Sequence, residues 1–132
     1  MTVVFRRIRH SFPVIGVPVS SQSSRESKKR YQQLVAQEAT KSVPSPIEDK
    51  EKVRIEIDWF SEGFENKPDS DNIVKPIIDA LKGILFADDR QVESHIARRH
   101  DTLGVMTFQM EPLLIIEPLL NGNNDYVFIR IY

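Results

Sequence analysis

The most regular feature of the chain is an alternation of apolar and polar residues over 52–60. Val53, Ile55, Ile57 and Trp59 are apolar, and a charged residue stands between each neighbouring pair. A period of two residues predicts a β-strand with one buried face. Shorter patterns of the same kind predict further strands at 3–8, 12–20, 90–99, 105–110 and 126–132.

Helical periodicity marks three other segments. The first covers 26–41, where Ser23 and Glu26 have the spacing of a capping box at the helix start. Its narrow buried stripe is expected at Tyr31, Leu34, Val35 and Glu38. The other two segments run over about 72–82 and 111–121, and each is closed by a glycine.

These elements predict an α+β fold in a single domain over residues 1–132. About three helices are expected to pack against one face of a mixed or antiparallel sheet of about four to five strands. Phe64 and Phe86 flank the second predicted helix and could stack on an unpaired base. Packing in the core is the favoured explanation for both rings.

The chain contains no cysteine, which excludes disulfides, thiolate metal sites and a cysteine nucleophile. A cytoplasmic location is the expectation that fits this composition. No apolar stretch approaches the roughly 18 to 20 residues of a membrane-spanning helix. We therefore expect no membrane among the partners.

The net charge of −1 hides an uneven distribution. Residues 1–41 carry eight basic side chains against two acidic ones, whereas 48–65 is rich in acids. Such an asymmetry fits a polyanion-binding surface beside an acidic pocket. It also fits an ordinary solvated surface of mixed charge, and composition alone favours that second explanation.

Residues 68–91 contain five aspartates, four beside the second predicted helix and one, Asp79, within it. Those at its two ends are Asp69, Asp71, Asp88 and Asp89, and Asp71, Lys75 and Asp79 share one face of the helix. These side chains could serve only as helix caps, turn residues and an ion pair. Closely spaced carboxylates are also the hard ligands that Mg²⁺ or Mn²⁺ prefers, and such metals activate water for phosphodiester hydrolysis.

The order of these residues resembles the central motif of the RusA family of Holliday-junction resolvases. The matching positions are Asp69, Asp71, Asn72, Lys75, Asp79, Leu81, Asp88, Asp89 and Gln91. The motif covers about a sixth of the chain, and several fixed residue types recur in the family's order. The resemblance implies a homodimeric endonuclease that cuts four-way or branched DNA in recombination and repair, using Mg²⁺ or Mn²⁺.

By the same resemblance, the metal ligands would be Asp69, Asp71 and Asp89, and Lys75 would be the essential lysine. Asp88 would be an acid beside the ligands. Asn72 is expected to cap the helix rather than bind the metal. A non-cleaving module that only binds branched DNA is the alternative, although the presence of every motif acid argues against it.

Basic residues near the motif are candidates for contacts with DNA phosphates. They are Arg25 just before the first predicted helix, Lys28, Lys29 and Arg30 within it, and Lys67 just before the acids. Such contacts give affinity without sequence information, and the bent shape of a junction needs no base reading. For any one of these residues, a solvated surface position is the competing explanation.

The separation of the acids raises a geometric question. A helix of about eleven residues is ~16 Å long, so Asp89 starts from the opposite end to Asp69 and Asp71. Residues 83–89 could fold back along the helix within one chain. Alternatively, a two-fold axis could bring the end of one helix beside the start of its partner's. The sequence leaves both arrangements open.

Overall fold

A computed structural model of the chain describes residues 1–3, 7–42, 47–108 and 113–132. The strands are β1 (His10–Ile15), β2 (Val53–Ser61), β3 (Val92–Asp101) and β4 (Tyr126–Ile131). The helices are α1 (Arg25–Lys41), α2 (Val74–Leu81) and α3 (Leu113–Leu120), with short 3₁₀ helices η1 (Ser70–Ile73) and η2 (Asp89–Gln91). Among the described residues, no helix is long and apolar enough to cross a membrane.

The four strands form one mixed sheet in the order β1-β4-β2-β3. β1 and β2 both pair antiparallel with β4, whereas β2 and β3 are parallel. A parallel pair needs a long crossover connection, which α2 supplies between β2 and β3. The expected α+β fold with a mixed sheet is therefore confirmed.

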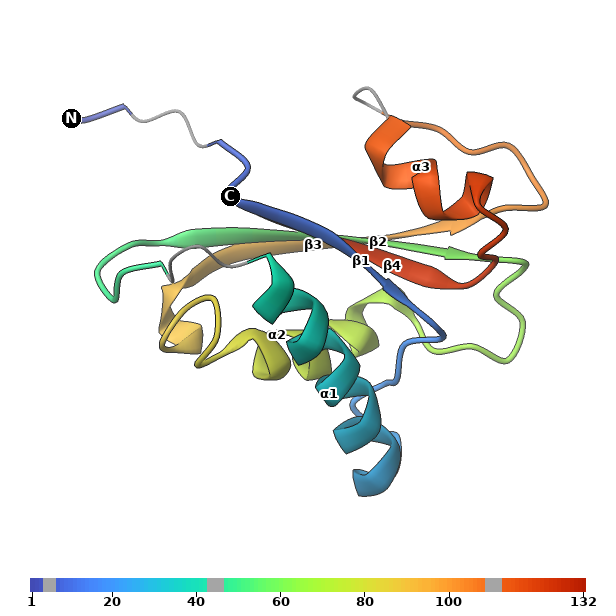
Figure 1. Cartoon of the computed structure of the whole chain (residues 1–132), viewed down its shortest axis with the longest axis horizontal. Coiled ribbons are helices and arrows are strands. Elements are labelled where there is room, and N and C mark those ends of the chain that lie inside the picture. The colour runs from blue at the N-terminus through green and yellow to red at the C-terminus, as the bar shows by residue number, and fades with distance from the viewer. Residues whose placement is uncertain (4–6, 43–46, 109–112) are drawn as a thin grey trace.

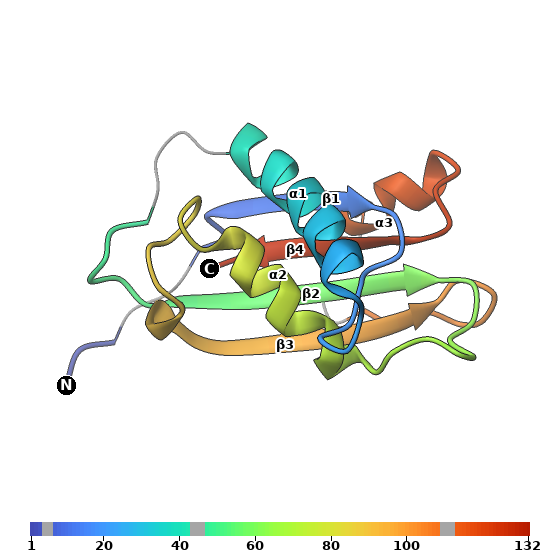
Figure 2. The same ribbon diagram turned by 90° about the horizontal axis from the view of Figure 1, so that it is seen from below.

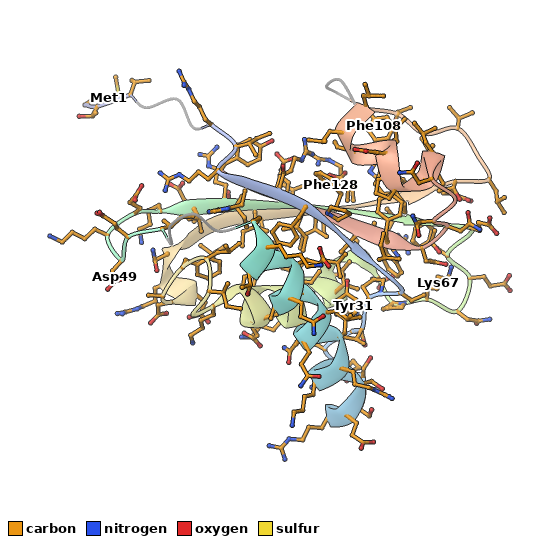
Figure 3. The ribbon with its side chains drawn as sticks, in the orientation of Figure 1. Met1, Tyr31, Asp49, Lys67, Phe108 and Phe128 are labelled. Carbon is orange, nitrogen blue, oxygen red and sulfur yellow. The ribbon has the colours of Figure 1, made fainter. Side chains whose placement is uncertain are left out.

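The helices cover both faces of the sheet. α1 and α2 lie side by side on one face, and α3 lies on the other (Figures 1 and 2). The expectation that all helices share one face is wrong. A second apolar cluster on the far face explains this, because Ile115 of α3 packs there with Phe60, Tyr126 and Phe128. In Figure 3, Phe108 and Phe128 lie on the α3 side of the sheet and Tyr31 lies on the α1 side.

The main core lies between the sheet and the helices α1 and α2. Ile55 and Ile57 of β2 point into it, as do Ile77 and Leu81 of α2, and all four are fully buried. Burial of such a side chain stabilises the fold by roughly 1.5–3 kcal/mol. This buried face holds α2 in place, so that its opposite face is fixed toward solvent.

Both aromatic rings beside the acidic segment belong to this core, which confirms the packing explanation. Phe86 is 1% exposed. Phe64 is partly buried and meets Trp59 edge-on, with 4.9 Å between the ring centroids.

Helix α1 begins one residue later than the capping-box spacing predicts. Ser24 is the N-cap, and its side chain accepts a hydrogen bond from the Ser27 N–H. Ser23 instead accepts a hydrogen bond from the Ser20 N–H, so its predicted capping role is wrong. The buried stripe also differs, because Leu34 is 45% exposed while Ala39 is buried.

The strand predicted at 105–110 does not form over 105–108, and its last two residues lie outside the described part. The predicted strand at 3–8 falls partly on 4–6, which also lie outside it, and residues 3, 7 and 8 are not in a strand. Strands β2, β3 and β4 confirm the other predictions. The first strand covers only part of its predicted range.

Candidate active site

The first two acids of the motif lie at the start of the helical segment, and their side chains do not cap it. Asp69 precedes η1 but makes no side-chain capping bond, and Asp71 lies in its first turn. Both side chains are exposed. Within the described ranges, neither carboxylate has a hydrogen bond or an ion pair. The capping explanation therefore does not account for them.

The predicted capping role of Asn72 is also wrong. Asn72 lies inside η1, and the N-cap position of α2 is Ile73, which has no side-chain capping bond. The Asn72 carbonyl would normally accept from the N–H four residues on, but Pro76 has no N–H. The Ser21 N–H donates to this carbonyl instead, at 2.9 Å.

A second hydrogen bond fixes the same turn from α1. The Gln32 Nε2 donates to the Pro76 carbonyl at 3.1 Å. Together with the Ser21 contact, it ties the N-terminal loop and α1 to the first turn of α2. The proline thus leaves the Asn72 carbonyl without its helical donor, and the Ser21 N–H bonds to it, while Gln32 bonds separately to the carbonyl of Pro76 itself.

Lys75 lies on the exposed face of α2 between two acids. Its Nζ is 2.7 Å from Asp79 Oδ1 and 4.0 Å from Asp89 Oδ2. The hydrogen bond to Asp79 raises the pKa of Lys75, and the charges of Asp79 and Asp89 act in the same direction. Lys75 therefore carries a full positive charge at neutral pH.

Asp89 opens η2, in the loop that follows α2. Besides Lys75, the ammonium of Lys82 lies 4.0 Å from its carboxylate. The Asp89 carboxylate therefore lies near the ammonium groups of Lys75 and of Lys82 at the C-cap of α2, while Asp69 and Asp71 precede the helix.

Gln91 holds this loop in place. Its Oε1 accepts from the N–H groups of Ala87 and Asp88, at 2.8 and 3.1 Å. Its Nε2 donates to the carbonyls of Glu48 and Glu51, at 2.8 and 3.0 Å. Gln91 is 4% exposed. A buried amide that makes four hydrogen bonds fixes the segment carrying Asp89.

The side chain of Asp88 caps η2. Asp88 Oδ1 accepts from the Arg90 N–H at 3.0 Å and, with Gln91, forms a capping box. That backbone bond lowers the pKa of Asp88, with a smaller contribution from Asp89. Its place beside the metal ligands stays a prediction. Aspartate followed by glutamine three residues later was the sequence signal for this cap, and the role of Gln91 was missed.

A groove of about 370 Å³ lies between α1 and α2, and its lining places basic residues beside Lys75. Its lining residues are Ser21, Arg25, Lys28, Lys29, Gln32, Lys75, Pro76 and Asp79. Three of the four basic residues predicted on α1 thus share one groove with the motif lysine. Arg30 is exposed but does not line it.

Lys67 is directed inward rather than toward this groove. Its ammonium donates to Ser61 Oγ and, at 2.9 Å, to the Gly63 carbonyl, and it lies 3.8 Å from Asp125. A contact between Lys67 and DNA stays a prediction, and it would compete with these bonds.

The three acids that the motif assigns to the metal do not meet within one chain. In the part of the chain that the structure describes, no group of three or more histidine or acidic side chains could hold a metal ion. Asp69 and Asp71 lie at the start of η1, whereas Asp89 is directed toward Lys75 and Lys82.

A comparison with protein families decides the ancestry. The model for endodeoxyribonuclease RusA matches residues 19–108, which is more than half of the chain. The chain belongs to the RusA family. No curated protein matches it. RusA is a family of endodeoxyribonucleases, so membership supports a nuclease.

The RusA match includes every candidate site residue. It covers α1, β2, α2 and β3, together with the loops that carry the acids, and leaves out β1, α3 and β4. The groove, the exposed face of α2 and the loops that carry Asp69, Asp71 and Asp89 are therefore the part of this RusA-family chain on which a nuclease site would be built.

Gln91→Glu should lower the free energy of unfolding by about 1–3 kcal/mol. The substitution keeps the size of the side chain but turns an oxygen toward the carbonyls of Glu48 and Glu51, which accepted the Nε2 hydrogens. Urea unfolding of both proteins measures the difference. Gln37→Glu, at an exposed position of α1, is the control. Equal stability of the two variants would contradict the role of Gln91 in holding the loop.

Proposed function

We propose that this protein is a metal-dependent endonuclease that resolves four-way DNA junctions in recombination or repair. The observation that carries the proposal is that the carboxylates of Asp69 and Asp71 are exposed and make no capping hydrogen bond. Neither side chain makes a hydrogen bond within the described residues, so capping does not explain this pair of acids. Their position in the RusA motif, beside a basic groove, supports a hydrolytic site for a polyanion.

Asp69 and Asp71 would hold Mg²⁺ or Mn²⁺, and Asp89 would complete the set. The fit rests on donor chemistry, because all three are carboxylates and these hard ions prefer oxygen ligands. Neither of the first two has a partner to displace among the described residues. When bound, the metal would supply an activated water and offset charge on the phosphodiester.

The protein is proposed to act as a homodimer that shares its metal sites. The exposed face of α2 and η1 carries alternating charges, Asp71, Lys75, Asp79 and Lys82. Antiparallel packing of two such helices about a two-fold axis is self-complementary. Lys75 would face the partner subunit's Asp79, and Asp71 would approach the partner subunit's Asp89. This arrangement would unite acids that lie apart in one chain.

The basic residues would hold the DNA backbone. Arg25, Lys28 and Lys29 line the groove that also contains Lys75, and their charges suit phosphates of any sequence. Lys75, kept protonated beside Asp79, would place an ammonium against the phosphate that is cut. Recognition of the bent junction shape would then supply selectivity.

The test is cleavage of a synthetic four-way junction by the full chain, with linear duplex of the same sequence as control. We expect paired nicks near the crossover that require Mg²⁺ or Mn²⁺, and little cutting of the duplex. Binding of the junction without cleavage in either metal would favour the non-cleaving module. Equal cutting of junction and duplex would support a nuclease without junction selectivity.

A further inference from the structure

A cavity of about 240 Å³ lies on the sheet face opposite the candidate active site. Its polar floor comes from three neighbouring strands and consists of Glu56, Asp58, Arg98, His100 and Arg130. Phe108 and Ile115 add apolar walls on the side of α3. Thr107, which is exposed, also lines it, so the cavity reaches solvent.

The lining is electrically balanced although it is rich in charge. Two carboxylates face two guanidinium groups: Arg130 Nη2 is 2.8 Å from Glu56 and 3.0 Å from Asp58. Arg98 Nη1 is 3.1 Å from Glu56. The His100 ring bonds to Asp58 at 2.7 Å. A floor of this composition does not favour a free anion or a free cation, because each would meet like charges.

Hydrogen-bonding capacity remains in the cavity after these contacts. Arg130 is 7% exposed, yet its Nε has no hydrogen-bond partner in the described part of the chain. A buried unpaired N–H is unfavourable and calls for an acceptor. Both arginines bond to the same oxygen of Glu56, Oε2, so Oε1 can accept a further hydrogen bond. The Arg130 Nε is itself covered, so the donors within reach of a ligand are those of Arg98, whose side chain is one-third exposed, beside the Glu56 acceptor.

We propose that this cavity binds a guanine base. Guanine is neutral, carries the O6 and N7 acceptors that arginine recognises, and has N–H donors for a carboxylate. Protein pockets that take single bases combine hydrogen bonds to the base edge with stacking on aromatic or apolar side chains. Phe108 supplies such a wall. Its ring is stacked on His100, with 5.1 Å between the ring centroids. The base would come from a free nucleoside or from an unpaired nucleotide of a strand.

Calorimetric titration of the full chain with guanosine tests the proposal, with adenosine as the comparison ligand. We expect guanosine to bind at least about tenfold more tightly than adenosine, because adenine presents an amino group where guanine has O6. Arg98→Gln should weaken guanosine binding by about tenfold or more. The Arg98 side chain is one-third exposed, so we expect the variant to keep its fold, which urea unfolding of the variant checks.

Arg99→Gln is the matched control. Arg99 is the next residue of β3 and contacts Phe64 on the opposite face, so its loss should leave guanosine binding unchanged. Phe108→Leu is a second variant, which removes the stacking wall without touching the charges, and it should also weaken binding. Equal binding by the Arg98 and Arg99 variants would overturn the proposal.

A second titration distinguishes the two sources of the base. Single-stranded oligothymidylate containing one guanine is compared with the same strand without it. A preference for the guanine strand that disappears in Arg98→Gln, without binding of guanosine, would assign the cavity to a base presented by nucleic acid. Absence of both guanosine binding and this preference would overturn the proposal. Asp71→Asn should bind guanosine normally, so failure of the nuclease function is a separate result.

Discussion

Asp71→Asn should abolish metal-dependent junction cleavage, with a loss on the order of 10³-fold, as when one charge-stabilising group is removed from an active site. The asparagine keeps the size of the side chain but removes one of the two neighbouring carboxylates that would hold the metal. Because the Asp71 carboxylate has no bond to the described residues, stability should change by less than about 0.5 kcal/mol. Cleavage rates and urea unfolding of the two proteins measure both quantities.

The control for this variant is Asp49→Asn. Asp49 is also exposed, lies in the loop before β2 and belongs to no proposed site, so cleavage should continue at the wild-type rate. Junction binding by Asp71→Asn should be retained or improved, because one negative charge is removed near the phosphates. If cleavage by Asp71→Asn is unchanged, Asp71 does not hold a metal that the reaction needs.

Mixing Asp71→Asn with Asp89→Asn tests whether the site is shared between subunits. If each site takes Asp71 from one subunit and Asp89 from the other, one site of a mixed dimer carries both substitutions. The other site of that dimer carries neither and is intact. Random exchange would restore about a quarter of the wild-type sites, because about half of the dimers are mixed and each has one good site. If each site lies within one chain, both sites stay damaged and the mixture stays inactive.

A mixed dimer with one intact site should nick only one strand of the junction. Nicked junctions, rather than paired cuts, are therefore the expected product of the mixture. Recovery of paired cuts would show that the substitutions do not inactivate their sites. The separate homodimers, assayed at the same total concentration, give the baseline.

Strands and helices whose pattern is local were predicted from the sequence. β2 alternates over its first half, and the periodicity of α1 fixed most of its length, because side-chain period follows directly from backbone geometry. Placement of α3 could not be predicted in this way. Its apolar residues give no indication of which sheet face they cover, and that choice depends on Phe60 and Phe128, which make a second apolar surface.

In the candidate site, too, features set by local spacing were predictable and contacts between distant segments were not. Asp71, Lys75 and Asp79 lie on one helix face, and this spacing allowed an ion pair of Lys75 with either acid. The structure shows the pair with Asp79. The helix start was misjudged because Pro76 removes a backbone donor and Ser21, far away in sequence, replaces it. No local pattern reports such a contact. Where Asp89 meets the other acids also depends on tertiary and quaternary structure.

Asp58→Asn should lower the free energy of unfolding by about 3–5 kcal/mol, the usual cost of breaking a buried ion pair from one side. The Asp58 side chain is 3% exposed and contacts His100 at 2.7 Å, Arg130 at 3.0 Å and Arg98 at 3.5 Å. Asparagine leaves the neighbouring cations under-compensated and turns an amide N–H₂ toward them. Urea unfolding at neutral pH measures the loss, and exposed Asp49→Asn should stay within about 0.5 kcal/mol of wild type.

The same substitution should alter how stability depends on acid. Burial alone would raise the pKa of Asp58, but the hydrogen bond from His100 and the nearby guanidinium charges outweigh it and lower the pKa. A carboxyl with a lowered native pKa stabilises the fold fully above its unfolded pKa of about 3.9. This contribution is lost as pH falls from there through the native pKa. Wild type should therefore lose more stability than Asp58→Asn below about pH 4, and parallel losses in both would show that Asp58 is not the carboxylate responsible.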